Sequence, residues 1–477
     1  MPFNSISFLV FFVLIATIYY LAKNLEIRTF LLIAGSWFFY GYDNIFNLLH
    51  ILFATFITLF FANKLTKKGN NKLILAVGIS ILLLQLILTK YHSELGHLFS
   101  IIAHPNNQFF DYAILPIGIS FYSLQAISLL VDIRNKKYTE RISFKNVLLF
   151  LNFFPQSISG PIHRANDLIP QFSKEKKFQT DNIIIGLKTV LWGYFCKLII
   201  ADKISIIITP IFNSFHDYNG LPLFLASLLF SFQIYFDFWG YSLIAIGLGK
   251  ILGFTINVNF NNPYSAGSFK IFWHKWHITL SKWMRDYVYI PLGGRNTNMY
   301  FLFFCSITIT FLVSGFWHGI ATNFIIWGGI HALLYLIEDL ARRHVINGLK
   351  IHLHPYFRSV LGLMQIILFF VLISFTWLIF KTEDFADVVQ IMSNIFSFSN
   401  WSLESLKKFY SLVNITYLFI ILASLVVAHT KLLQRKMGLV AISTADKITD
   451  SFYIFFCFIL IVLLGDIGGN EFLYFKF

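Results

Sequence analysis

The sequence predicts an all-α polytopic membrane protein, and three observations support this prediction. Hydrophobic residues make up 57% of the 477 residues, whereas charged residues make up only 13%. A soluble globular protein needs about 25% charged residues to cover its surface. The apolar residues are also gathered into runs, several of which approach the roughly 20 residues that a membrane-spanning helix needs. This composition excludes a disordered chain, a collagen-like repeat and a disulfide scaffold.

The apolar runs follow one another along the whole chain and indicate about 11–13 membrane segments. Several runs are short or are broken by glycine and proline, as at residues 153–162. Because irregular backbone is tolerated at membrane depth only inside protein or along a cavity, we expect re-entrant or buried segments within a compact bundle. No internal repeat or linker divides the sequence, so we expect residues 1–477 to form a single domain. The runs lie near residues 6–22, 28–43, 46–62, 73–89, 111–131, 146–160, 183–200, 223–248, 300–316, 323–340, 359–380, 413–428 and 450–465.

The formal net charge of +14 follows the pattern of a membrane protein rather than that of a nucleic-acid-binding protein. Residues 63–72 and 134–145 carry clusters of Lys and Arg, and they alternate with residues 41–44 and 91–111, which carry none. Cytoplasmic loops of membrane proteins are enriched in Lys and Arg. We therefore expect a multi-pass protein with its N-terminus outside the cytoplasm, and no nucleic-acid partner.

Residues 272–294 combine histidine, tryptophan and arginine at a density that is unusual for a connecting loop of a membrane protein. If this segment is helical, four polar side chains share one face, because residues three and four positions apart are neighbours on a helix. One interpretation is an amphipathic helix at the membrane interface. The other is a polar face that lines a cavity and binds an anionic, phosphate-bearing ligand; composition alone leaves both open. The four residues are His274, His277, Ser281 and Arg285.

A second candidate site lies between two apolar runs, in the sequence Gly315-Phe-Trp-His318-Gly319. Imidazole is the side chain best able to accept and return a proton near pH 7, so His318 is a candidate general base. The alternative is a hydrogen-bonded structural histidine, which is the more frequent role of a lone histidine. Asn323, at the start of the next run, belongs to the same polar cluster.

A third cluster is a polar stripe on the otherwise apolar run 223–248, where Gln233, Asp237 and Tyr241 recur at every fourth position. An ionisable group at membrane depth needs a partner inside the protein. We expect Asp237 to pair with an Arg or Lys from residues 272–294. The polar motif at residues 115–125 is more simply explained by helix packing through small residues.

We expect no metal site. The pair His274 and His277 lacks an accompanying Glu, and the HExxH motif is absent. If residues 318–331 form one continuous helix, His318 and His331 lie on nearly opposite faces. The chain also lacks the phosphate loop of ATPases, the nucleophile elbow of hydrolases and the dinucleotide-binding glycine motif. An ATP-driven pump and an elbow-type hydrolase are therefore disfavoured.

Taken in order along the chain, the motifs resemble those of the membrane-bound O-acyltransferase (MBOAT) superfamily, and more narrowly its bacterial branch of alginate and peptidoglycan O-acetyltransferases. The ordered set is far more specific than a lone Trp-His pair. Trp239 and Leu243 replace a serine and an aspartate of that branch, which bears on substrate identity or on the packing of that helix. The motifs are residues 2–8, 115–122, 153–156 with 160–161, 233–238, 259–260 with 263–264, 276–281, 285–287 with 290–294, 315–319 and 472–477.

This resemblance implies a single MBOAT-type transmembrane domain, bundled around a central funnel from the cytoplasm. His318 matches the catalytic histidine of the superfamily, and His277 matches the histidine of the Trp-His motif. Acetyl would leave acetyl-CoA, or a similar acyl thioester, and would cross the bacterial cytoplasmic membrane to a polysaccharide acceptor. The implied partners are an esterase-like extracytoplasmic acetyltransferase protein and membrane lipid, with no tightly bound cofactor. We expect the side chains of Trp276, Ser281, Arg285, Asp237, Gln233 and Asn323 to bind substrate.

Two alternatives remain open at this stage. The first keeps the enzyme but transfers D-alanine to teichoic acid. The second is a polytopic transporter of a glycan or lipid. Transporters often contain internal repeats and broken helices in both halves, whereas this chain shows no repeat and concentrates its histidines in the second half. The enzyme is therefore favoured over the transporter.

Overall fold

The structure is a computed structural model that describes residues 1–68, 71–91, 116–156, 160–218, 220–294, 299–343, 355–382, 384–397, 401, 404, 407, 409, 447–466 and 472–473. Every regular element in these ranges is a helix, which confirms the predicted all-α class. The elements are α1 (Ile6–Leu21), α2 (Leu25–Gly41), α3 (Ile45–Lys68), α4 (Lys72–Lys90), α6 (Ile119–Arg134), α7 (Phe144–Asn152), η1 (Phe154–Gln156), α8 (Ala165–Phe172), α9 (Thr180–Tyr194), η2 (Phe195–Ala201), α10 (Asp202–Asn213), η3 (Phe215–Asp217), α11 (Leu221–Ile251), η4 (Pro263–Ser265), α12 (Phe269–Lys275), α13 (Ile278–Met284), η5 (Arg285–Tyr289), α14 (Tyr300–His318), α15 (Thr322–Ala341), α16 (Pro355–Lys381), α17 (Phe385–Phe396) and α21 (Lys447–Leu464).

Seven helices in the described ranges are long and apolar enough to cross a membrane, so the protein is a multi-pass membrane protein, as predicted. Three further apolar helices are shorter, at Ile6–Leu21, Phe385–Phe396 and Ile454–Leu464. The predicted segment 413–428 and the ends of two motifs, at residues 115 and 474–477, lie outside the described residues. The seven candidate spans are Ile45–Lys67, Lys72–Lys90, Thr180–Asn213, Leu221–Ile251, Tyr300–His318, Thr322–Ala341 and Ser359–Lys381.

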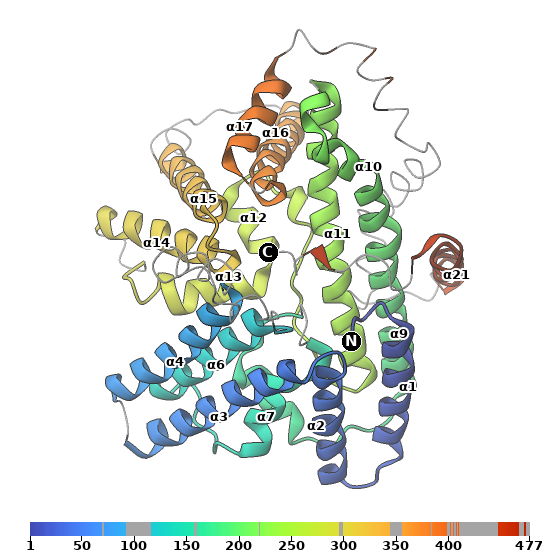
Figure 1. Cartoon of the computed structure of the whole chain (residues 1–477), viewed down its shortest axis with the longest axis vertical. Helices are drawn as coiled ribbons and strands as arrows, with labels where there is room; N and C mark the ends of the chain where they lie inside the picture. Colours follow the sequence, from blue (N-terminus) through green and yellow to red (C-terminus); the bar gives the residue numbers. More distant parts are fainter. Residues whose placement is uncertain are drawn as a thin grey trace, which may run out of the picture. The chain divides into compact units, whose positions relative to one another are not determined.

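The chain divides into two compact units. The first comprises Met1–Val190 and Ser242–Val258, and the second comprises Leu191–Tyr241 and Asn259–Phe477. In the first unit α3, α4 and α6 pack on one another, and α7 packs on α2, α3 and α8 (Figure 1). The predicted segment 153–162 is buried at residues 153–156 and 160–162, as expected, and residues 157–159 lie outside the described residues.

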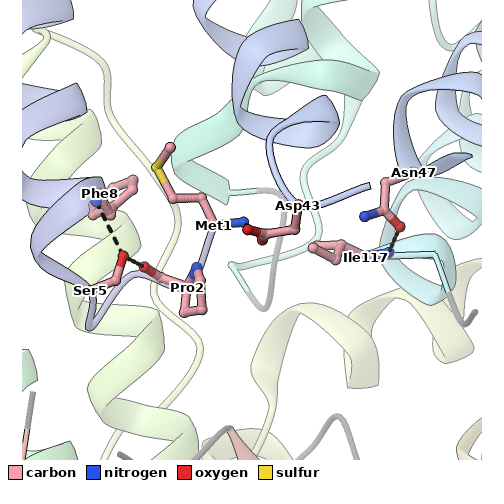
Figure 2. A network of polar contacts seen from close by, with 7 residues as sticks. All are labelled: Met1, Pro2, Ser5, Phe8, Asp43, Asn47 and Ile117. Atoms are coloured by element: carbon pink, nitrogen blue, oxygen red, sulfur yellow. Dashed lines mark hydrogen bonds and ion pairs between the residues drawn. The ribbon is translucent and has the colours of Figure 1, made fainter. Parts of the chain in front are cut away.

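The start of the chain is fixed to the loop between α2 and α3 by polar contacts (Figure 2). The α-amino group of Met1 forms an ion pair with the carboxylate of Asp43. The hydroxyl of Ser5 accepts a hydrogen bond from the backbone N–H of Phe8 at 3.1 Å and so caps α1. Met1 is almost completely buried, with 1% of its surface exposed.

In the second unit, α14 and α15 lie side by side as an antiparallel pair (Figure 1). Two glycines allow this close approach. A Cβ atom on Gly315 would overlap the backbone carbonyl of Phe324, and one on Gly328 would lie 2.5 Å from the carbonyl oxygen of Phe311. Small residues at such positions let membrane helices pack backbone against backbone. Gly315, three residues before His318, is therefore explained by helix packing.

This geometry predicts opposite outcomes for two neighbouring glycines of α15. Gly328→Ala is expected to destabilise the protein by about 1–3 kcal/mol, because the added methyl group overlaps α14. Gly329→Ala is expected to be neutral or mildly stabilising, because a Cβ there meets no atom within 4 Å and alanine favours helix. Thermal unfolding of the two variants in detergent measures the difference. Equal unfolding temperatures would contradict the close contact at Gly328.

Candidate active site

The segment with the predicted histidine face is not one helix. α12 ends at Lys275 and α13 begins at Ile278, with His277 between them in the left-handed region at φ 41°. The backbone groups freed by this break are satisfied by a neighbouring extended stretch: Asn261 donates its N–H to the carbonyl of Lys275 at 3.0 Å, and Ile278 donates to the carbonyl of Asn259 at 2.8 Å. The predicted shared face was therefore wrong, because helical spacing does not hold across His277.

One amide oxygen, Oδ1 of Asn259, contacts both His277 and Thr279. Nδ1 of His277 lies 3.1 Å from Oδ1 of Asn259, and the same oxygen accepts the backbone N–H of Thr279 at 3.3 Å and the hydroxyl of Thr279 at 2.8 Å. Since a backbone N–H can only donate, the facing atom of Asn259 is the oxygen, and Nδ1 of His277 must carry the hydrogen. The other ring nitrogen, Nε2, then carries a lone pair that can accept a proton or a hydrogen bond.

Burial keeps this imidazole neutral. Only 1% of His277 is exposed, and desolvation lowers its pKa to about 3. A second buried histidine, His163 in the first unit, has its pKa lowered to about 4 by the same cause. Buried groups resist charging because the charged form loses its water. The side chain of His277 is thus a neutral hydrogen-bonding group across the physiological pH range.

The lowered pKa of His277 predicts that acid destabilises the protein. An unfolded histidine takes up a proton near pH 6.5, whereas folded His277 does so only near its pKa of about 3. The free energy of unfolding should therefore fall as the pH drops below about 6.5, by at most about 1.4 kcal/mol per pH unit from this group. His277→Asn should weaken this pH dependence, because asparagine does not titrate and tolerates the left-handed backbone. The exposed His216, changed to Asn, is the matched control and should keep the wild-type unfolding temperature at neutral pH. An identical pH dependence in His277→Asn and the wild type would contradict the assignment.

His318 is the last residue of α14 and is buried, with 6% of its surface exposed. Its ring is surrounded by aromatic rings, with centroid distances of 4.9 Å to Trp317, 5.5 Å to Trp327 and 5.2 Å to Phe380. The ring of Trp317 also lies 6.2 Å from that of His277. The fold thus brings the two predicted catalytic histidines against the same indole ring, in a water-poor environment.

His331 lies close to this cluster, contrary to the opposite-face expectation. His318 ends α14 whereas His331 belongs to α15, and both rings contact Trp327, His331 at 4.6 Å. Nε2 of His331 lies 3.2 Å from the hydroxyl of Thr376. His331 contacts Thr376, and Asn259 contacts His277, across long stretches of sequence. Motif spacing therefore did not predict that His331 and Asn259 lie beside the candidate site. Within the described ranges, no three His, Cys, Asp or Glu side chains gather as a metal site would require.

Asp237 has a buried partner, but not the predicted one. Its carboxylate lies 2.7 Å from Nζ of Lys197, which belongs to the π-helical segment η2 rather than to residues 272–294. Lys197 also lies 2.7 Å from Asp202, and the second oxygen of Asp237 accepts the backbone N–H of Leu473 at 2.8 Å. The signal that could have indicated this group is a lysine and an aspartate at the end of the apolar run 183–200. The neighbouring residue on α11, Phe238, packs its ring 4.7 Å from that of His277.

The other predicted substrate residues are dispersed. Trp276 is buried beside His277, with its ring stacked 5.6 Å from that of Phe272. Asn323 donates from Nδ2 to the carbonyl of Thr382 at 3.0 Å, just after α16 ends. Gln233 is buried on α11, and its side-chain oxygen has no hydrogen-bond partner among the described residues. Trp276 therefore packs within the aromatic cluster that precedes His277 in the chain, whereas Asn323 binds the backbone at the end of α16.

Ser281 and Arg285 line a separate cavity of about 240 Å³ together with His274. His277 and His318 are not among the residues that line it. The break at His277 accounts for this separation, because it turns the side chain of His277 away from the face that α13 continues. The four residues of the predicted polar face are thus divided, with His277 buried and the other three lining the cavity.

Comparison with known proteins agrees with this architecture. Residues 29–380 match the model of the membrane-bound O-acyltransferase family. A probable alginate O-acetylase of Pseudomonas aeruginosa is 34% identical over 68% of this chain, and the match spans only 59% of that relative's length. A peptidoglycan O-acetyltransferase of Helicobacter pylori is 31% identical over 85% of this chain and 80% of its own length. A teichoic acid D-alanyltransferase of Bacillus subtilis is 28% identical over 56% of this chain and 68% of its own length. The chain belongs to the membrane-bound O-acyltransferase family.

Proposed function

We propose that this protein is a membrane O-acetyltransferase that passes acetyl from a cytoplasmic thioester donor across the membrane for O-acetylation of an extracytoplasmic polysaccharide of the alginate or peptidoglycan type. One observation carries the proposal: His277 and His318 are buried against the same Trp317 ring. The names of the O-acetyltransferase relatives support the acyl group and the acceptor class. The relative named for D-alanyl transfer is less similar and supports the second candidate, D-alanylation of teichoic acid.

In the proposed reaction His318 is the general base. It takes the proton of the acceptor hydroxyl while the hydroxyl oxygen attacks the thioester carbonyl, so that a carbon–oxygen bond forms and the carbon–sulfur bond breaks. The departing thiolate then takes this proton from the imidazolium, which returns His318 to its neutral form. No serine or cysteine nucleophile is needed in this direct transfer. The aromatic rings around His318 keep bulk water away from the thioester, which would otherwise be hydrolysed.

His277 has the complementary role of a fixed acceptor. Asn259 and Thr279 hold its ring, and the lone pair on Nε2 can accept a hydrogen bond from the nucleophile or from the donor's amide groups. Because the imidazole is neutral, this contact does not depend on pH in the physiological range. Trp276 contributes an apolar wall beside it.

The remaining parts of the proposal concern location and partners. The charge pattern of the first loops supports a bacterial cytoplasmic membrane protein with its N-terminus outside. The donor would be acetyl-CoA or a similar acyl thioester, with no cofactor bound tightly. The acetyl group would pass to an esterase-like partner protein outside the membrane, which would modify the polysaccharide.

The experiment is a donor-consumption assay with the full-length protein in sealed membrane vesicles. Acetyl-CoA carrying a labelled acetyl group is supplied on the cytoplasmic side, and free thiol and base-labile acetyl ester are measured on the two sides. Protein-dependent thiol release with labelled ester outside is the expected result. If the protein forms D-alanyl ester from a D-alanyl thioester and transfers no acetyl group, the acetyl proposal is overturned in favour of D-alanylation. Transport of a labelled glycan without thioester consumption would overturn the enzyme.

A further inference from the structure

We infer that the cavity beside α13 and α14 binds an anionic phospholipid, with its phosphate at the rim and the start of its acyl chain inside. The cavity, called here the basic cavity, has a volume of about 240 Å³. Lys270, His274, Lys282 and Arg285 line it, and no Asp or Glu is among the described residues of its wall. Neither His277 nor His318 is among the described residues that line it.

The charge at the rim indicates an anionic ligand. Lys270 and Lys282 are exposed and have no ion-pair partner among the described residues, whereas Arg285 is paired with Asp286 at 2.8 Å. Each basic side chain near an anionic lipid surface contributes about 1 kcal/mol of attraction. The indole N–H of Trp273, which also lines the cavity, has no acceptor among the described residues. The two lysines and this N–H together suit a phosphate group.

The inner wall indicates that the ligand is also apolar. Ile307 and Phe311 of α14, together with Leu280 and Met284 of α13, line the interior of the basic cavity. A free phosphate or a sugar phosphate would leave this apolar wall without a partner, whereas the start of an acyl chain can pack against it.

The surrounding surface provides a route from the bilayer. The helices α14 and α15, whose residues line the cavity, are both candidate membrane spans. They expose large apolar side chains, with 73% of Phe301, 56% of Leu333 and 52% of Ile337 accessible. Such a surface on a membrane span faces lipid. A lipid can therefore enter sideways and leave most of its chains in the bilayer.

The size of the cavity distinguishes a lipid from the whole acyl donor. Sites that enclose a drug-sized molecule have volumes of about 300–1,000 Å³, and a nucleotide thioester is larger than most drugs. A space of about 240 Å³ instead suits a phosphate and a few methylene groups. This inference does not depend on the proposed function, and its test contains no acyl donor.

The test is lipid binding to the purified full-length protein, measured by native mass spectrometry with phosphatidylglycerol and phosphatidylcholine. The wild type should bind phosphatidylglycerol more tightly than phosphatidylcholine. The double variant Lys270→Gln/Lys282→Gln should lose about 10- to 30-fold in phosphatidylglycerol affinity, which corresponds to two basic contacts. A matched double variant, Lys174→Gln/Lys177→Gln, removes two exposed lysines elsewhere and should bind as the wild type does.

A second variant tests the apolar part of the site. Thr310→Phe fills the interior from α14 and leaves all four basic residues in place, so it should also weaken phosphatidylglycerol binding. Equal affinity in the Lys270→Gln/Lys282→Gln variant and the wild type would overturn the proposal. So would displacement of bound lipid by soluble coenzyme A together with an unchanged affinity in Thr310→Phe, because the cavity would then be a site for a soluble phosphate compound.

Discussion

His318→Ala is expected to reduce acetyl transfer about 10²–10⁴-fold without unfolding the protein, because a positioned general base contributes that factor to proton transfer. The ring of His318 packs against the rings of Trp327 and Phe380, and its truncation leaves the glycine contacts between α14 and α15 in place. Initial rates of thiol release from labelled acetyl-CoA by vesicles that contain equal amounts of folded protein measure the effect.

The control for this prediction is another histidine of the same unit. His216 is exposed in η3, and its Nδ1 lies 3.0 Å from Nε2 of Gln390. His216→Ala should retain the wild-type rate. A wild-type rate in His318→Ala, with folded protein confirmed by its elution as a monodisperse species, would rule out His318 as the base.

Lys197→Met is expected to destabilise the protein by about 3–5 kcal/mol, because it leaves two buried carboxylates without their shared cation. The side chains concerned are nearly inaccessible, with 2% of Lys197, 3% of Asp237 and 7% of Asp202 exposed. Both carboxylates lie 2.7 Å from the lysine nitrogen. An unfolding titration in mixed micelles of a denaturing and a mild detergent measures the loss.

The matched variant is Asp202→Asn, which removes one carboxylate and leaves the pair of Lys197 and Asp237. It lowers the excess negative charge of the cluster, so its effect should be less than half that of Lys197→Met. If Asp202→Asn is the more damaging of the two, the lysine is not the group that neutralises this site. The comparison separates the charge of the cluster from the mere presence of buried polar atoms.

Sequence alone predicted the helices well where the backbone N–H and C=O groups of a helix are hydrogen-bonded within that helix. The apolar run 300–316 corresponds to α14 (Tyr300–His318), and the run 323–340 corresponds to α15 (Thr322–Ala341). In a membrane, a continuous apolar run has few alternatives to a helix, because no water is present to satisfy a free N–H or C=O group. Length and hydropathy therefore carried most of the information.

The same reasoning could not predict the site around His277. The spacing of residues 274–285 suits a helix, and the break depends on hydrogen bonds in which the carbonyl of Asn259 accepts and the N–H of Asn261 donates. The partner of Asp237 was missed for a related reason. Lys197 lies on a segment 40 residues earlier, and only the packing of η2 near α11 brings the two charges together. Contacts of this kind are set by tertiary structure, which helical periodicity does not encode.

The position of His318 at the last residue of α14 has an electrostatic consequence. The aligned peptide dipoles of a helix place roughly half a negative charge at its C-terminal end. In the proposed reaction the imidazole becomes positively charged when it takes the hydroxyl proton, and it does so at that end. A histidinium in a partly buried site of this kind gains up to about 2 kcal/mol from the dipole. The helix that positions the proposed base would thus also lower the free energy of the charged state through which the acyl group passes.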